Sequence, residues 1–306
     1  MSFSLTILGN SSATPTKDRY PSSQLLNIQN QFFLIDCGEG TQMRLKHLGI
    51  KFLKIDHVFI SHLHGDHFFG LVGLISTMHL FGRTKVLRIY APLALKEIIE
   101  IQLKSSETQL NFQIDYVVLR ENQQSTIFNS KNLKICSFPL KHRIPTWGFI
   151  FNEKEKPLNI KPEIIAKYHL TVEQVLEVKN GSDIEVDGEV LNNFNITYSN
   201  FKPKSFAYCS DTIFDLSIVD YIKDVDVLYH EATFLKELAH IAKEKFHSTA
   251  EEAAIIASEA KCKLLIIGHY SARYDDLTPL LSESKAIFDK TVLAETDYTF
   301  NLREII

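Results

Sequence analysis

The stretch Ser61-His62-Leu63-His64-Gly65-Asp66-His67 places four candidate metal ligands within six residues, directly after an apolar run. Side chains two apart on a strand point to the same side, so His62 and His64 can reach one point. Gly65 allows a sharp backbone turn that brings Asp66 and His67 to a second point nearby. The pattern therefore predicts a loop serving two adjacent metal ions, an arrangement used for phosphodiester cleavage. A solvated, histidine-rich turn is the plain alternative, but this spacing after a strand is a specific motif.

Three further candidate ligands each follow a predicted buried strand elsewhere in the chain. His142 follows the strand expected at 133–138, Asp211 follows 205–210, and His269 follows 264–268. Loops that leave the carboxyl ends of strands in an α/β sheet gather along one edge. Four separate strands, including the one before the histidine loop, are therefore expected to bring ligands to one edge.

Coordination chemistry suggests how these ligands divide between two ions. One ion is expected to take three imidazoles and the other a mixed set, with one carboxylate bridging them: His62, His64 and His142 for the first, Asp66, His67 and His269 for the second, and Asp211 between them. Zn²⁺ favours such a nitrogen and oxygen mixture, although Mn²⁺ or Fe²⁺ would also fit. A lone His after a strand is usually structural, whereas three such ligands beside a four-ligand loop indicate a dinuclear site.

The remaining histidines carry weaker signals. His230 ends a predicted strand, and His247 stands at a predicted helix start, where it could simply belong to the N-terminal capping region. Five others have no partner pattern and are assigned to the surface or the core: His47, His57, His79, His169 and His240.

Composition is that of an ordinary soluble globular protein. The 306 residues are 45% hydrophobic and 23% charged, enough for one large α/β domain or two smaller ones. The formal charge of −4 gives no global attraction to nucleic acid, although a local basic patch would still steer binding. The four cysteines are far apart and form no C-x-x-C pair, so reduced, buried thiols are expected: Cys37, Cys136, Cys209 and Cys262. The N-terminus has no basic region typical of a signal peptide, and a cytoplasmic location is expected.

Apolar runs predict strands in both halves of the chain, with helical patterns between several of them. The helix expected at 248–260 opens with Ser248-Thr249 and then Glu251-Glu252, a good cap with acidic first-turn residues. Alternating strands and helices favour α/β layers with the helices outside. The expected strands are 3–8, 25–28, 32–35, 58–60, 133–138, 205–208, 225–229 and 264–267, and the other expected helices are 40–48 and 69–80.

The segment 152–200 has a different composition. It carries five lysines among Pro, Asn and Gly, with helical pieces expected near 162–168 and 172–178. Such a shift predicts an arm inserted into the main domain. A plain surface excursion is the alternative, and composition alone does not separate the two.

These residues together resemble the metallo-β-lactamase superfamily and, within it, the ribonuclease Z family of tRNA 3′-processing endonucleases. The resemblance covers essentially the whole chain. The broad superfamily is marked by the histidine loop 61–67, His142, Asp211 and His269. The ribonuclease branch is marked by three motifs that true β-lactamases lack: Asp36-Cys37-Gly38-Glu39-Gly40-Thr41-Gln42, His230-Glu231-Ala232-Thr233 and Phe246-His247-Ser248-Thr249.

The resemblance implies an αββα sandwich, a single domain over residues 1–306 with an RNA-binding arm inserted at 152–200. It implies a zinc-dependent endoribonuclease that removes the 3′ trailer of precursor tRNA, with two Zn²⁺ ions per chain. Asp66 would orient and deprotonate the attacking water, and His247, held by Glu231, would protonate the departing O3′.

The implied partners are precursor tRNA and a second copy of the chain, with the arm of one subunit holding tRNA cut by the other. DNA and membranes are not expected partners. Phosphate contacts are assigned to five cations: Lys17, Arg19, Lys154, Lys156 and Lys161.

Two stretches depart from the family pattern. The loop that the family uses to reject tRNA already ending in CCA has Tyr20 where Asn is usual. The stretch that corresponds to the arm tip, 170–174, lacks the usual Gly and Pro. CCA discrimination and the contacts of the arm are therefore not carried over.

Two rival functions share the same fold. The first is a small-molecule hydrolase on the same metal centre, for example a phosphodiesterase, sulfatase or lactamase, against which the long lysine-bearing arm argues. The second is a non-catalytic RNA-binding subunit, against which the intact ligand set argues.

Overall fold

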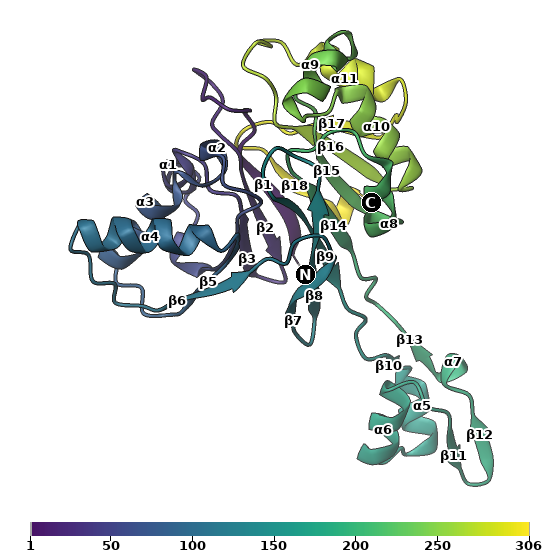
Figure 1. Cartoon of the computed structure of the whole chain (residues 1–306). Coiled ribbons are helices and arrows are strands. Elements are labelled where there is room, and N and C mark those ends of the chain that lie inside the picture. The colour runs from purple at the N-terminus through teal and green to yellow at the C-terminus, as the bar shows by residue number, and fades with distance from the viewer. Residues whose placement is uncertain (1, 306) are drawn as a thin grey trace. The chain divides into compact units, whose positions relative to one another are not determined.

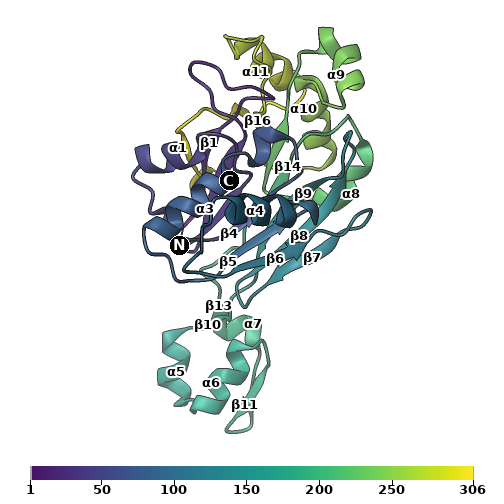
Figure 2. The same cartoon turned by 60° about the vertical axis from the view of Figure 1, so that its left-hand side comes forward.

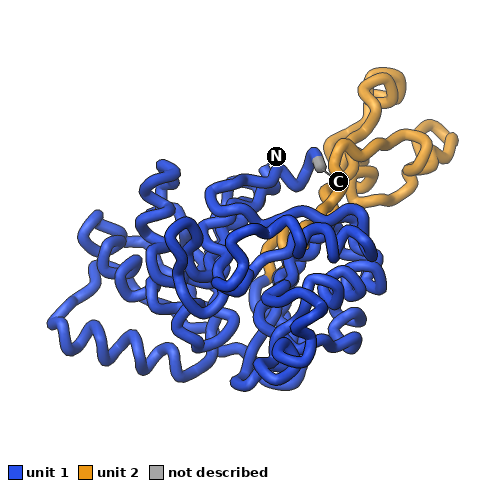
Figure 3. Tube along the Cα trace, turned by 90° about the horizontal axis from the view of Figure 1, so that it is seen from above, with its two compact units in different colours: residues 1–128, 135–151, 205–306 blue, residues 129–134, 152–204 orange. Residues whose placement is uncertain are grey.

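The computed structural model describes residues 2–305, and these form two compact units (Figure 3). Unit 1 comprises residues 1–128, 135–151 and 205–306, and unit 2 comprises residues 129–134 and 152–204. Both units come from discontinuous stretches, because the chain leaves unit 1 after residue 151 and returns to it at residue 205.

The first sheet of unit 1 has seven strands in the order β18-β1-β2-β3-β4-β5-β6. Its β18, β1, β2 and β3 strands pair antiparallel, whereas β3 to β6 pair parallel. The strands are β1 (Phe3–Gly9), β2 (Ser23–Ile28), β3 (Gln31–Ile35), β4 (Ile55–Phe59), β5 (Leu87–Ala91), β6 (Ile114–Val118) and β18 (Thr299–Asn301).

The second sheet also has seven strands, in the order β17-β16-β15-β14-β9-β8-β7. Its β14 to β17 strands pair parallel. The strands are β7 (Ser125–Asn129), β8 (Leu133–Leu140), β9 (Thr146–Glu153), β14 (Ser205–Cys209), β15 (Val227–Glu231), β16 (Leu264–Gly268) and β17 (Thr291–Leu293).

Helices cover the outer face of each sheet (Figures 1 and 2). The first sheet carries α1 (Thr41–His47), α2 (Gly65–Phe68), α3 (Leu71–Leu80) and α4 (Ala94–Ser105). The second carries α8 (Val219–Ile222), α9 (Ala239–Lys245), α10 (Ala250–Glu259) and α11 (Thr278–Lys285), and a short helix, α12 (Leu302–Ile305), follows β18. Short 3₁₀ turns lie at Phe52–Lys54, Leu216–Ile218 and Lys236–Leu238. The predicted αββα arrangement is confirmed.

Side-chain alternation along the strands builds three apolar layers. In β4, Val58 faces the helices and packs in one cluster with α3 and α4, whereas Phe59 faces the other sheet. Phe59 there meets Phe149, with ring centroids 5.3 Å apart, and Phe33 meets Phe151 at 5.8 Å. A separate cluster joins the second sheet to α8, α10 and α11. The central strands of both sheets are thus buried on both faces, which explains their nearly continuous apolar sequences, whereas the edge strands β6 and β7 stay partly exposed.

Unit 2 has its own small core. It contains β10 (Asn159–Ile160) paired with β13 (Thr197–Tyr198), β11 (Ile184–Val186) paired with β12 (Glu189–Leu191), and the helices α5 (Pro162–Tyr168), α6 (Val172–Lys179) and α7 (Asn193–Ile196). Six buried apolar side chains fill its interior: Ile160, Val178, Ile184, Val186, Leu191 and Ile196. The two helical pieces expected from the sequence are present as α5 and α6.

The cysteine prediction is confirmed, because all four thiols are free and buried. In the part of the chain that the structure describes, no helix is long and apolar enough to cross a membrane.

Candidate metal centre

The seven predicted ligands come together at strand ends of unit 1 and fall into neighbouring groups. One group contains His62, His64, His142 and Asp211, and another contains Asp66, His67 and His269. Within each group the candidate ligand atoms lie within 4.8 Å of one another. The expectation of a single sheet edge was wrong: the histidine loop follows β4 of the first sheet, whereas the other ligands follow β8, β14 and β16 of the second.

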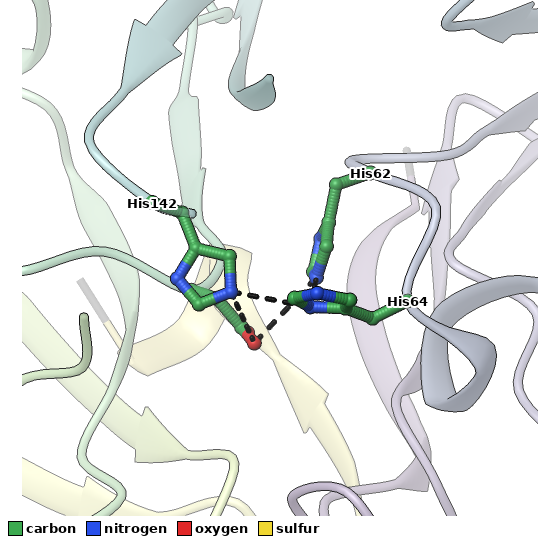
Figure 4. A group of neighbouring side chains, drawn as sticks. His62, His64 and His142 are labelled. Atoms are coloured by element: carbon green, nitrogen blue, oxygen red, sulfur yellow. Dashed lines mark hydrogen bonds and ion pairs between the residues drawn. The ribbon is translucent and has the colours of Figure 1, made fainter. Parts of the chain in front are cut away.

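The first group is a set of converging imidazoles (Figure 4). Nδ1 of His64 lies 3.0 Å from Nε2 of His62 and 3.2 Å from Nε2 of His142. Burial holds the pKa of His62 well below its usual value and lowers the pKa of His64 to about 4. Neutral imidazoles that turn nitrogen lone pairs toward one point suit a shared cation.

Asp211 offers a different oxygen to each group. Its Oδ2 lies 3.6 Å from Nε2 of His62 and 3.9 Å from Nε2 of His142. Its Oδ1 lies 3.4 Å from Nε2 of His67 and 3.2 Å from Nε2 of His269. Among the described residues, Oδ1 of Asp211 and Nε2 of His67 are buried without a hydrogen-bond partner. Orphaned buried polar atoms are costly, so this arrangement fits metal ions that they would ligate.

Opposing effects act on the Asp211 carboxyl group. Burial raises its pKa, but the neighbouring His269, His67 and His62 outweigh burial and hold the pKa well below the usual range. Burial likewise lowers the pKa of His67, whereas the carboxylates of Asp211, Asp66 and Asp36 raise it well above normal. The site thus favours positive charge between its carboxylates, which either a proton or a metal ion supplies.

The second group is held by surrounding hydrogen bonds. Oδ2 of Asp66 lies 3.4 Å from Nε2 of both His67 and His269, and it accepts a hydrogen bond from the backbone N–H of Ala13 at 2.8 Å. Nδ1 of His269 lies 3.0 Å from the hydroxyl of Thr233. The backbone of His269 is left-handed, with φ 59°, a strained conformation for a non-glycine residue that often marks a functional site.

Asp36 contacts two residues of the histidine loop, Ser61 and His67, and holds the loop in place. Its fully buried carboxylate lies 2.8 Å from Nδ1 of His67 and accepts hydrogen bonds from the Ser61 backbone N–H at 2.7 Å and the Tyr208 hydroxyl at 2.8 Å. A carboxylate behind a ligand imidazole fixes its tautomer and orientation. Asp36 belongs to the motif at residues 36–42, but its individual role is not evident from the sequence because its contacts come from strands far apart in the chain.

His247 and Glu231 form a pair beside these groups. Nδ1 of His247 lies 2.9 Å from Oε1 of Glu231, the last residue of β15. Glu231 also accepts hydrogen bonds from the Thr212 backbone N–H at 2.9 Å and the Thr233 hydroxyl at 2.6 Å. Burial lowers the pKa of His247, but the carboxylates of Glu231, Asp211 and Asp66 together outweigh burial and raise the pKa to about 9.

The capping alternative for His247 finds no support in the local geometry. Thr249 is the N-cap of α10, where its side chain and that of Glu252 form a reciprocal capping box. The ring of His247 instead turns toward Glu231. His247 also lies close enough to Asp211 and His269 to form a third candidate metal group.

A cavity of about 450 Å³ opens over the ligands. Its wall includes Arg143 and Phe69, which the sequence motifs did not single out as site residues. The guanidinium of the exposed Arg143 lies 3.4 Å from Nε2 of His64. Its position directly after a predicted ligand was the available signal.

The five cations assigned to RNA differ in their surroundings. Lys17 is exposed in the loop that follows Pro15, which lines the cavity. Arg19 is only 9% exposed, and its guanidinium donates to the backbone carbonyls of Tyr274 and Ser271. The assignment of Arg19 to a phosphate is therefore not supported, because the side chain is buried and its N–H groups hold the loop around residues 271–274.

The three arm lysines also contact their own unit. The ammonium of Lys154 donates to the Asn129 side chain at 2.6 Å, that of Lys161 donates to the Asn195 carbonyl at 2.6 Å, and that of Lys156 lies 4.5 Å from the Phe201 ring centroid. Residues 152–204 contain seven lysines but nine acidic residues, so this stretch is not basic overall.

Solved structures define the class of protein. The short form of human tRNase Z matches with a TM-score of 0.71 at 25% sequence identity, covering 98% of this chain and 99% of the human chain. The metallo-β-lactamase fold protein YhfI from Bacillus subtilis matches with a TM-score of 0.69 at 17% identity, covering 98% and 99% of the two chains. The fold is thus the metallo-β-lactamase fold.

Sequence comparisons identify the family within this fold to which the chain belongs. Ribonuclease Z from Bacteroides fragilis strain YCH46 is 43% identical over 301 residues, which cover 98% of this chain and 99% of the relative. The model of the family described as "Anti-Pycsar protein Apyc1" matches residues 3–288. The chain therefore belongs to the sequence family that this model describes and, by its relatives, to the ribonuclease Z family.

Proposed function

We propose that this protein is an endoribonuclease that removes the 3′ trailer of precursor tRNA and leaves a 3′-hydroxyl on the tRNA. The supporting observation is the His247–Glu231 pair beside two His/Asp groups, in a chain 43% identical to ribonuclease Z over nearly its whole length. A hydrolytic centre with an adjacent proton donor suits cleavage of a phosphodiester whose leaving group is an alcohol.

We assign two Zn²⁺ ions to the ligand groups, with Asp211 shared between them, and Mn²⁺ or Fe²⁺ as alternatives. The buried, unpaired atoms of Asp211 and His67 support this assignment. When bound, the ions would polarise the phosphate oxygens and acidify a water molecule.

Each catalytic residue then has a defined task. The Asp66 carboxylate orients the attacking water and accepts its proton as the oxygen attacks the phosphorus that follows the discriminator nucleotide. His247, protonated at neutral pH when its pKa is about 9, donates a proton to the departing O3′. Glu231 keeps His247 oriented and charged. The trailer leaves with a 5′-phosphate, and no cyclic phosphate forms because water is the nucleophile.

Recognition of the large substrate is assigned to surfaces outside the cavity. Lys17 and the arm lysines Lys154, Lys156 and Lys161 are proposed to contact phosphates, which position RNA without reading its sequence. We propose a homodimer in which the arm (152–200) of one subunit contacts tRNA held by the other. Since precursor tRNA is the substrate, we place the reaction in the cytoplasm.

The second candidate is a small-molecule phosphodiesterase or sulfatase on the same centre. The cavity of about 450 Å³ would admit such an ester. A competition assay, in which precursor tRNA and a small ester compete for the same enzyme, distinguishes the two functions by which substrate is cleaved preferentially.

The direct test is incubation of the purified protein with a 3′-extended tRNA precursor, with and without a chelator, followed by analysis of the product ends and of bound metal. We expect one cut after the discriminator nucleotide, a 3′-hydroxyl on the tRNA, and loss of activity with chelator. An intact precursor in the presence of saturating zinc would refute the proposal.

A further inference from the structure

Phe69 is an exposed aromatic ring at the edge of a polar cavity. Its side chain is 66% exposed, although an apolar ring of this size is usually buried. It lines the same cavity as His64, Asp66 and His247. A ring in this place is therefore available to whatever the metal centre cleaves.

The ring is held in position by its own neighbours. Phe69 follows α2 directly, and its ring lies against the backbone of Gly65, where an added Cβ would come within 2.2 Å of it. The ring also meets that of Phe68, at 5.0 Å between centroids in an edge-to-face contact. Phe68 is buried in the core between the first sheet and its helices. Phe69 thus packs on Gly65 and Phe68 while most of its ring surface faces solvent.

An RNA substrate brings a nucleobase on each side of the phosphate that is cut. The cavity places the Phe69 ring beside Asp66 and His64, so a base flanking that phosphate falls within reach of it. Base stacking on an aromatic ring is a common source of binding energy for single-stranded RNA and tolerates any base, because every base has a π face.

We propose that Phe69 is a positioning residue on which the base of a nucleotide next to the scissile phosphate stacks. The proposal rests on the proposed function, since it requires an RNA substrate in the cavity. Stacking would fix the sugar–phosphate backbone over the ligands, and an error of about 1 Å in such positioning costs roughly 10²-fold in rate.

The test is a double-mutant cycle between the protein and the RNA. Wild type, Phe69→Ala and Phe69→Tyr are each assayed on a precursor tRNA, and on two versions with an abasic nucleotide just before or just after the cleavage site. We expect Phe69→Ala to lower kcat/KM about 5- to 150-fold on the normal precursor, the range expected for one lost stack. Phe69→Tyr should retain most activity.

The deciding measurement is whether the loss in kcat/KM from Phe69→Ala and the loss from the missing base are independent of each other. At the stacked position, the abasic precursor should be poor for wild type, and Phe69→Ala should lose little more on it. At the other position the two losses should multiply. Multiplying losses at both positions would overturn the proposal. If wild type cuts none of the precursors, the proposed function itself fails, which is a distinct result.

A matched control separates stacking from association of two chains. Met43 in α1 is 63% exposed and does not line the cavity, so Met43→Ala removes a similar exposed apolar surface. It should leave kcat/KM unchanged. A loss in Phe69→Ala that is matched by Met43→Ala, and that accompanies a changed elution volume in gel filtration, would assign the ring to a contact between copies and refute stacking.

Discussion

Asp211 lies between the two ligand groups, and its two oxygens face different imidazoles. We expect Asp211→Ala to reduce RNA cleavage to background and to lower the metal content, since two cations would then face each other without a carboxylate between them. Elemental analysis and cleavage assays on the same preparation measure both effects. The exposed Asp289→Ala is a suitable control. A variant of Asp211 with two metals per chain and near-normal turnover would mean that the proposed partition of ligands is wrong.

His247 offers a test of proton donation. If it protonates the departing O3′, His247→Ala should lower turnover about 10²- to 10⁴-fold, the usual range for a positioned acid. The defect should shrink on a nitrophenyl phosphodiester, whose leaving group barely needs a proton, while tRNA affinity stays close to wild type. Turnover on both substrates measures the difference. Equal defects on the two substrates would argue against proton donation.

His57 lies in the layer between the sheets and should make stability depend on pH. Burial lowers its pKa to about 4, and the nearby Arg88 adds to this effect. Its ring stacks on Phe33 at 5.3 Å. Above pH 6.5 both the folded and unfolded chains hold it neutral, but between pH 6.5 and 4 the unfolded chain takes up a proton that the folded chain does not. Stability therefore falls as the pH falls, by about 1–2 kcal/mol at pH 5 from this residue.

Replacing His57 with Phe should remove this part of the pH dependence. Denaturant titrations at pH 7 and pH 5 would show a smaller drop in unfolding free energy for His57→Phe than for wild type. Val172→Phe, at an exposed position that carries no titratable group, is the control and should leave the drop unchanged. An identical drop in His57→Phe and wild type would show that His57 has the same pKa in the folded and unfolded chains, and the prediction would be wrong.

At the scale of elements, α10 links the fold to the His247 loop through its N-terminal cap. The Thr249 side chain accepts a hydrogen bond from the Glu252 backbone N–H at 3.2 Å, and the Glu252 side chain accepts one from the Thr249 N–H at 2.8 Å. We expect Thr249→Ala to cost about 1 kcal/mol of stability, the usual effect of a lost cap. Thermal unfolding should show a midpoint lower by roughly 2–4 °C. Turnover should change little at 25 °C. A large kinetic defect without loss of stability would instead give Thr249 a part in the site.

Elements with a strong local pattern could be predicted from the sequence. The helix at 248–260 was expected from its cap and is observed as α10, Ala250–Glu259. The strand before the histidine loop was expected at 58–60 and is observed as β4, Ile55–Phe59. Its boundaries shift because pairing with neighbouring strands, rather than apolarity, decides where a strand ends.

Features that depend on distant contacts could not be predicted in the same way. The division of ligands between two sheets follows from strand pairing across the whole chain, which no local pattern contains. The burial of Arg19 depends on carbonyls at Ser271 and Tyr274, more than 250 residues away in sequence. The role of Asp36 likewise depends on Tyr208. Charge type alone suggested a phosphate contact for Arg19, and the tertiary structure gave it another partner.

At the scale of the whole molecule, most of unit 2 lies between two chain positions that are close in space. The Glu153 backbone N–H donates to the Lys204 carbonyl at 3.0 Å, so the two ends of the excised segment are neighbours. We expect replacement of residues 154–203 by a short Gly-Ser linker to weaken cleavage of precursor tRNA, about tenfold for each 1.4 kcal/mol of binding lost. Hydrolysis of a small phosphodiester should be spared, because remote binding energy is used only on the large substrate.

Steady-state assays of the excised variant on precursor tRNA and on the small phosphodiester measure the two effects. Equal losses on the two substrates would mean that the segment stabilises the metal centre and does not recognise tRNA. Lys154→Ala, Lys156→Ala and Lys161→Ala, combined in the intact chain, are the matched variant. Residues 152–204 carry more acidic than basic residues. The salt dependence of tRNA binding by the triple variant should therefore be weaker than that of wild type by, at most, the contribution of three phosphate contacts.

The wide spacing of the ligands along the chain also sets an order of events during synthesis. His62 and His269 are the first and last of the seven, 207 residues apart. At 5–20 residues per second, a ribosome needs roughly 10–40 s to pass from one to the other. Until residue 269 is made, the metal centre lacks at least one of its seven predicted ligands. If all seven predicted ligands are needed, a nascent chain that stops before His269 should not cut RNA.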